Sequence, residues 1–87
     1  MRKIIVFIYY KDINQLDEIL LILQSLNINN DYQSKKDSDY IIITQEDSLT
    51  TEEMIQNNFS KIKKVIGVFK FFKEGKLEKE FIIDNKT

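Results

Sequence analysis

Hydrophobic residues alternate or run together in four short stretches that are rich in β-branched and aromatic side chains. This pattern predicts β-strands over residues 3–10, 39–45, 65–72 and 76–84. The first and third stretches are apolar at both alternating sets of positions, which is typical of central strands that are covered on both faces. The chain is therefore expected to build a sheet with at least two buried central strands.

The two C-terminal stretches are expected to pair as an antiparallel hairpin. Glu74-Gly75 marks a tight turn between them. A three-residue loop over 74–76 would set Lys70 opposite Glu80, a favourable cross-strand pair. A slip of one residue would instead oppose two lysines, so the charges select the register.

Two longer segments repeat apolar residues at a spacing of three and four, which predicts amphipathic helices over 11–27 and 48–64. In the first helix the apolar surface extends round to Leu21 and Ile22, beyond the width of a single face. A helix that is apolar so far round either lies deep in the core or makes a second contact. We expect such a contact with another subunit.

Both helices carry capping signals at their starts. Asp12 with Gln15, and Thr50 with Glu53, have the spacing of a capping box. In the second helix, acidic residues occupy the predicted first turn and lysines the predicted last turn, as the helix dipole favours. These signals predict that the second helix starts after Thr50 and continues into the lysine-rich segment.

The polar segment 28–34 decides between two folds, because its alternation at Ile28, Asn30 and Tyr32 suits either an edge strand or a loop. A strand there gives an α+β, ferredoxin-like βαββαβ sandwich with an additional C-terminal β-strand. A loop gives a thioredoxin-like βαβαββ order that lacks the last helix. The ferredoxin-like arrangement needs only the two helices that the chain offers, so we favour it.

The chain of 87 residues forms a single domain, with a core over 3–73 and an extra hairpin strand over 76–84. Hydrophobic residues make up 43% of it, enough for a folded core. Ile, Lys, Asn, Phe and Tyr are frequent and Pro is absent, which indicates an A/T-rich genome. The basic start followed by an alternating apolar run predicts a first strand and no signal peptide, and no transmembrane span is expected, so we predict a cytoplasmic protein.

The composition also excludes several kinds of chemistry. The chain has no Cys and no His, which removes thiolate chemistry, zinc fingers and histidine acid–base catalysis. Its carboxylates do not have the spacing of a calcium loop, so no metal or other cofactor is expected. A net charge of −1 argues against a nucleic-acid-binding role. We therefore expect no enzymatic activity.

Three segments resemble parts of the ACT domain, a small regulatory module of amino-acid-pathway enzymes. LILQSLNIN is similar to its first helix running into strand two, DYIIITQED to its third strand, and FSKIKKVIGVFKF to the entry of strand four. The resemblance covers roughly residues 3–73. It implies a non-enzymatic module that acts through oligomerisation or through binding of a partner or small metabolite, and that is regulatory.

The ACT resemblance also implies a ligand position between subunits, at the turn after the first strand together with the entry to the second. The candidate ligand-binding residues there are Lys11, Asp12, Asn14, Asn27, Asn29 and Asn30. Helix N-terminal amides at this turn would hold a carboxylate. The turn YKDINQ departs from the family pattern because it contains no glycine.

A second resemblance is to thioredoxin-like domains, in IIVFIYYKDINQLDEILLILQSL and in the hairpin FKFFKEGKLEKEF. KDINQL stands where that family carries C-x-x-C, so this alternative implies a redox-inactive protein-interaction domain. Composition and size raise a further alternative, a phage or mobile-element inhibitor of a host protein.

The ferredoxin-like arrangement predicts an association surface. It places both helices on one face of the sheet, so the apolar residues of the other face would be left open to water. We therefore expect a homodimer or a complex with another protein, joined through the sheet face or its edge. The candidate interface residues are Phe69, Phe71, Phe72, Phe81, Leu21 and Ile22.

Overall fold

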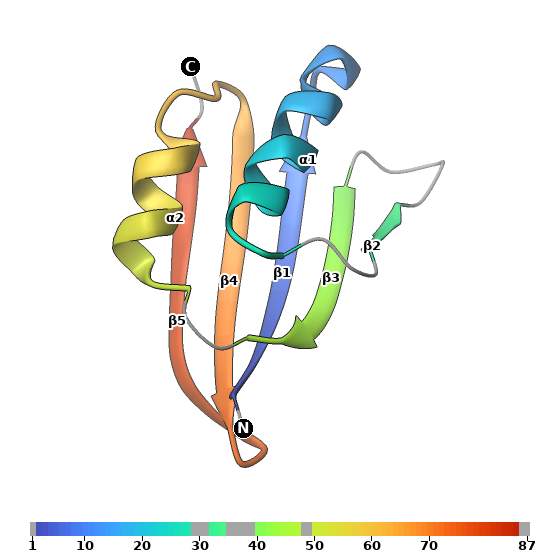
Figure 1. Ribbon diagram of the computed structural model, residues 1–87. Coiled ribbons are helices and arrows are strands. Elements are labelled where there is room, and N and C mark those ends of the chain that lie inside the picture. The colour runs from blue at the N-terminus through green and yellow to red at the C-terminus, as the bar shows by residue number, and fades with distance from the viewer. Residues whose placement is uncertain (1, 29–31, 35–39, 48–49, 86–87) are drawn as a thin grey trace.

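Both helices of the protein lie on the same face of a single antiparallel sheet (Figure 1). The computed structural model describes residues 2–28, 32–34, 40–47 and 50–85. The strands are β1 (Arg2–Tyr10), β2 (Tyr32–Ser34), β3 (Tyr40–Glu46), β4 (Val65–Lys73) and β5 (Lys76–Asn85). The helices are α1 (Leu16–Ser25), preceded by the 3₁₀ turn η1 (Ile13–Gln15), and α2 (Glu52–Phe59). The strand order β2-β3-β1-β4-β5 makes this a small α+β protein.

β1 is the central strand, as its two apolar faces predict. It pairs antiparallel with β3 on one side and with β4 on the other. Every second residue of β1 points toward the helices and is buried, namely Ile4, Val6, Ile8 and Tyr10. The same alternation in β3 buries Ile41 and Ile43. The core therefore lies between this face of the sheet and the helix layer.

α1 closes the core through Ile19 and Leu23, which are both fully buried. After the helix, the amide of Ile28 donates to the carbonyl of Leu23 at 2.8 Å and the amide of Asn27 to that of Gln24 at 3.0 Å. Asn27 adopts a φ of 60°, so these bonds form a Schellman motif. The motif turns the chain so that Ile28 is buried against the helix it follows.

α2 begins one residue later than its capping signal predicts and ends earlier. Thr51, in extended conformation, accepts a hydrogen bond from the Met54 amide at 3.2 Å and is the N-cap. The helix ends at Phe59, so the predicted lysine-rich last turn is wrong and Lys61 lies beyond it. Ile55 and Phe59 form the buried stripe, whereas Met54 is largely exposed.

Replacing Thr51 with alanine is expected to lower the free energy of unfolding by about 1 kcal/mol, because the amide of Met54 loses its acceptor. Urea denaturation followed by circular dichroism measures this loss. Thr51→Ser keeps the hydroxyl and should keep most of the stability. Equal losses in both variants would mean that the cap bond contributes little.

The β4–β5 hairpin confirms the predicted register but not the predicted loop. Lys70 lies opposite Glu80, as the charges require. The loop has two residues, Glu74 and Gly75, which both adopt positive φ, at 53° and 77°. Such a turn matches the twist of the flanking strands. The two-residue loop leaves one extra residue in β5. This residue is Glu78, which is unpaired in a bulge opposite Phe71/Phe72, and the bulge restores the predicted register.

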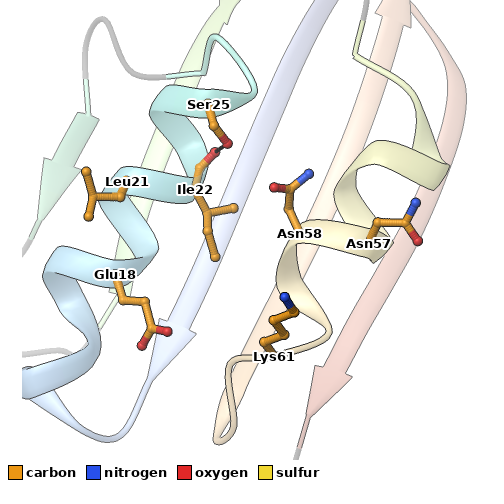
Figure 2. A pocket seen from close by; sticks show the side chains of 7 residues that line it. All are labelled: Glu18, Leu21, Ile22, Ser25, Asn57, Asn58 and Lys61. Carbon is orange, nitrogen blue, oxygen red and sulfur yellow. Dashed lines mark hydrogen bonds between the residues drawn. The ribbon is translucent and has the colours of Figure 1, made fainter.

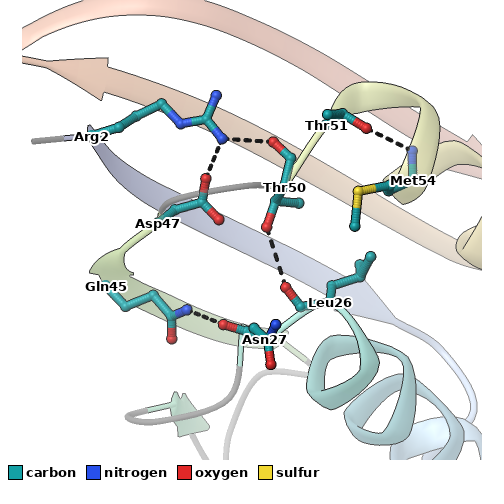
Figure 3. A network of polar contacts seen from close by, with 8 residues as sticks. All are labelled: Arg2, Leu26, Asn27, Gln45, Asp47, Thr50, Thr51 and Met54. Carbon is teal, nitrogen blue, oxygen red and sulfur yellow. Dashed lines mark hydrogen bonds and ion pairs between the residues drawn. The ribbon is translucent and has the colours of Figure 1, made fainter.

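A polar network ties the start of β1 to the connection before α2 (Figure 3). Asp47 is buried there. Its carboxylate accepts a hydrogen bond from the Arg2 guanidinium and forms an ion pair with it. The same guanidinium donates to the Thr50 carbonyl at 2.7 Å, and the Thr50 hydroxyl donates to the Leu26 carbonyl at 3.2 Å. Thr50 is therefore used to join the two helix ends and does not cap α2.

Candidate interaction surface

The face of the sheet that points away from the helices is called the open face below. Its centre is a row of four apolar residues, one from each of four neighbouring strands. In the register, Phe7 of β1 lies opposite Ile42 of β3 and opposite Val68 of β4, and Val68 lies opposite Ile82 of β5. We call Ile42, Phe7, Val68 and Ile82 the apolar row. It crosses the sheet from β3 to β5 without a polar interruption.

The rows on either side of the apolar row are mixed. Toward the turn after β1, the next row consists of Tyr40, Tyr9, Ile66 and Asp84. The rings of Tyr9 and Tyr40 lie 5.7 Å apart in a tilted arrangement. Toward the β4–β5 turn, the next row consists of Thr44, Ile5, Lys70 and Glu80. The open face therefore has an apolar centre with polar groups beside it.

Apolar side chains of the open face are exposed to a degree that the helix-facing side does not show. Ile82 is 59% exposed and Tyr9 45%, whereas Ile4 and Val6 on the other face are fully buried. Phe7 is half-buried, with the Lys70 ammonium 5.7 Å from the centre of its ring. Contiguous apolar surface of this kind commonly marks an interaction site.

A hollow of about 500 Å³ lies on the open face near the β4–β5 turn. It is lined by Lys3, Ile5, Thr44, Phe72, Glu74 and Gly75. The hollow adjoins the apolar row, because Ile5 and Phe7 are two residues apart on β1. The open face is thus not flat, and a protruding side chain of a partner would fit there.

The helix layer carries a separate groove, between α1 and α2 (Figure 2). Its volume is about 320 Å³, and its lining is Glu18, Leu21, Ile22, Ser25, Asn57, Asn58 and Lys61. Leu21 is 65% exposed at this groove. Figure 2 shows that Ile22 of α1 points toward Asn58 of α2, whereas Leu21 points away from α2, so the groove is less apolar than the open face.

The predicted interface residues separate into three groups. Phe69 and Phe71 are 0% and 2% exposed and belong to the core, where Phe81 stacks on Phe69 with the ring centres 5.3 Å apart. Phe72 lies on the open face beside the hollow. The third group, Leu21 and Ile22, lines the groove between the helices. Of the six residues, the open face contains Phe72.

The predicted ligand-binding residues lie at opposite ends of α1. Lys11, Asp12 and Asn14 precede the helix, and the Asp12 carboxylate accepts a hydrogen bond from the Asn14 amide at 3.0 Å. Asn27 follows the helix, where it forms the Schellman motif described above. Asn29 and Asn30 lie outside the described residues. The described candidates are therefore separated by the length of α1, about 15 Å at 1.5 Å per residue.

Sequence reasoning did not select Ile82, Tyr9 or Val68, which are the residues that define the open face. The signal was present in the alternation, since β1 and β4 are apolar at both sets of positions. Phe69 and Phe71, which were predicted as interface residues, alternate with Val68 along β4 and therefore lie on the opposite face of the sheet. The alternation along β4 groups Val68 with Phe72 and not with Phe69.

In the part of the chain that the structure describes, no three acidic, histidine or cysteine side chains are grouped so as to hold a metal ion. Within the same ranges, no helix combines the length and the apolarity that crossing a lipid bilayer requires. Comparisons of the chain with protein-family models, with curated proteins and with solved structures found no match.

Proposed function

We propose that this protein is a non-enzymatic, ACT-like association module that works as a homodimer joined through its open face. The observation that carries the proposal is the apolar row, which both described helices leave uncovered because they lie on the opposite face (Figure 1). Burial of such residues is the main source of association free energy. A second copy of the chain is the occupant of this surface, and a regulatory role follows from control of its dimerisation.

The ferredoxin-like form of the proposal is supported by the strand pairing. The strand order β2-β3-β1-β4 with antiparallel neighbours is the order expected of a βαββαβ sandwich, and β5 adds to its edge. A thioredoxin-like βαβ unit would instead make parallel neighbours through a crossover. The pairing of β2 with β3 also favours the strand alternative for the segment 28–34.

A second copy suits the open face because charged groups on this face form pairs of opposite sign. Lys3 lies opposite Glu46, and Lys70 opposite Glu80, so each half of the face carries both charges. Asp84 adds a further negative charge to this face, so its charge is close to balanced; such a surface around an apolar centre can meet its own copy with little net repulsion, whereas a strongly basic or acidic partner would gain little from it.

Edge-to-edge pairing through β5 is less favourable. The first half of β5 is exposed and consists of Lys and Glu side chains apart from Leu77, and Glu78 has no partner in the register because of the bulge. Charged residues and bulges at an edge strand oppose the addition of another strand. This difference favours association through the face of the sheet.

Sedimentation equilibrium tests the proposal with two matched variants. Ile82→Lys places a charge in the apolar row at a position that is already 59% exposed, so the fold should persist. Loss of one buried isoleucine from each copy is expected to raise the dimer dissociation constant by about 100-fold or more. Leu21→Lys changes a residue of similar exposure, 65%, on the helix layer and should leave the dimer intact.

A wild-type chain that remains monomeric at high concentration would overturn the proposal and favour a complex with another protein. A dimer that Leu21→Lys weakens and Ile82→Lys does not would place the contact at the helix groove. Circular dichroism of both variants verifies that each is folded.

A further inference from the structure

We infer that the two copies are related by a twofold axis that runs along the strands, between β1 and β4, so that β3 of each copy faces β5 of the other. This inference rests on the proposed homodimer and adds its geometry. Two sheets that pack face to face keep their strands within about 30° of each other and lie about 10 Å apart. An axis along the strands satisfies this requirement and leaves both helix layers on the outside.

The apolar row meets itself in this arrangement. Rotation about the axis reverses the order of the strands but keeps each row at its own level. Ile42 then faces the partner's Ile82, and Phe7 faces the partner's Val68, with the row order taken from the strand register. Each apolar residue of the row is thereby covered by another apolar residue.

In the mixed row toward the β4–β5 turn, Ile5 faces the partner's Lys70, and the outer residues form a polar contact. Thr44 of β3 faces the partner's Glu80, so the threonine hydroxyl can donate a hydrogen bond to the carboxylate. Glu80 keeps Lys70 as its neighbour on β4. A carboxylate at the rim of the contact thus has a cation beside it and a hydroxyl opposite it, which limits the cost of its desolvation.

The hollow receives a side chain in the same geometry. It lies over β1 and its neighbours, and an axis between β1 and β4 brings the partner's β4 above it. The residue of β4 at this level is Phe72, which lies opposite Lys3 in the register. The partner's Phe72 therefore projects toward the hollow, and the two symmetry-related rings would fill the space at this end of the contact.

An axis across the strands is less favourable in each of the three placements that keep the apolar row inside the contact. Placed through the row, it would bring Glu80 against the partner's Asp84, and the two carboxylates would repel. Shifted toward the β4–β5 turn, it would press Glu80 onto the partner's Ile82, and shifted the other way it would press Asp84 onto the same residue; in both cases the carboxylate faces an apolar side chain. The axis along the strands avoids all three of these contacts.

Cross-linking of single-cysteine variants distinguishes these axes, because the chain has no cysteine of its own. Ile42→Cys and Ile82→Cys are prepared separately, unfolded and refolded as an equimolar mixture, and treated with a short bismaleimide. We expect a cross-linked dimer from the mixture and none from either variant alone. Facing residues are about 10 Å apart between sheets, whereas identical residues are also displaced sideways by three strand spacings, about 14 Å.

A covalent dimer from Ile82→Cys alone would overturn the inference, since it requires either an axis across the strands or pairing of the two β5 edges. If sedimentation shows a dimer but no mixture of variants becomes cross-linked, the proposed axis is wrong and the proposed homodimer still stands. Thr44→Cys mixed with Glu80→Cys provides a second facing pair if the first variants do not fold. A monomeric wild-type chain would instead refute the proposed function itself.

Discussion

Replacement of Phe69 with alanine is expected to lower the free energy of unfolding by about 3–5 kcal/mol, the cost typical of removing a buried aromatic ring. Phe69 is fully buried and joins three elements. Its ring meets that of Phe59 in α2 edge-on at 5.7 Å and stacks on that of Phe81 in β5 at 5.3 Å. Loss of this ring would leave a cavity between α2 and the sheet.

The neighbourhood of Phe69 cannot refill that cavity easily. Gly67, two residues earlier on β4, has no side chain, and a Cβ there would lie 2.7 Å from the Phe69 ring. The ring thus occupies the space that Gly67 leaves open. A domain of this size is stabilised by about 4–13 kcal/mol in all, at 0.05–0.15 kcal/mol per residue, so the variant would approach the limit of folding.

Urea denaturation of Phe69→Ala measures the loss, and Phe72→Ala is its matched control. Phe72 lies on the same strand but on the open face, where it is half-buried. Its removal should destabilise the monomer less and weaken the dimer more. Equal losses of unfolding free energy at low protein concentration, where dimers are dissociated, would contradict the division of β4 into a core face and an interaction face.

Replacement of Arg2 with methionine is the second large effect that we expect, about 3 kcal/mol of unfolding free energy. The Asp47 side chain is only 3% exposed, and Arg2 is its cation. Breaking a buried pair costs about 3–5 kcal/mol because the remaining charge stays buried without a counterion. The lower end applies here, because the Arg2 side chain is 31% exposed. Methionine keeps an apolar stem near Phe71, over whose ring the guanidinium lies at 4.5 Å.

A double-mutant cycle separates the ion pair from the other contacts of Arg2. The double variant Arg2→Met/Asp47→Leu removes both charges and should recover part of the loss, giving a coupling energy above about 1 kcal/mol. The exposed pair Lys79–Glu52, with its charged atoms 2.9 Å apart, is the control. Lys79→Met should cost less than about 1 kcal/mol. Similar costs for Arg2→Met and Lys79→Met would contradict a buried role for Asp47.

The position of Thr50 shows why the start of α2 was misplaced by one residue. The capping-box spacing of Thr50 with Glu53 is a local signal, whereas Thr51, which has Met54 three positions later, caps α2 through its hydroxyl alone. Thr50 is instead held by contacts with Arg2 and Leu26, which are distant in the chain. The spacing of residues within the segment gives no information about those distant contacts.

Strands β1, β3, β4 and β5, the presence of the two helices and the pairing of Lys70 with Glu80 follow from the amino-acid order, because each depends on a period, a turn residue or a charge that acts between near neighbours. The amino-acid order does not determine which side of the sheet the helices cover. Strands β1 and β4 are apolar on both faces, so alternation groups Val68 with Phe72 and Phe69 with Phe71 but does not say which group is buried. That choice is made when the helices dock, because the face they cover becomes the core and the other remains free for a second molecule.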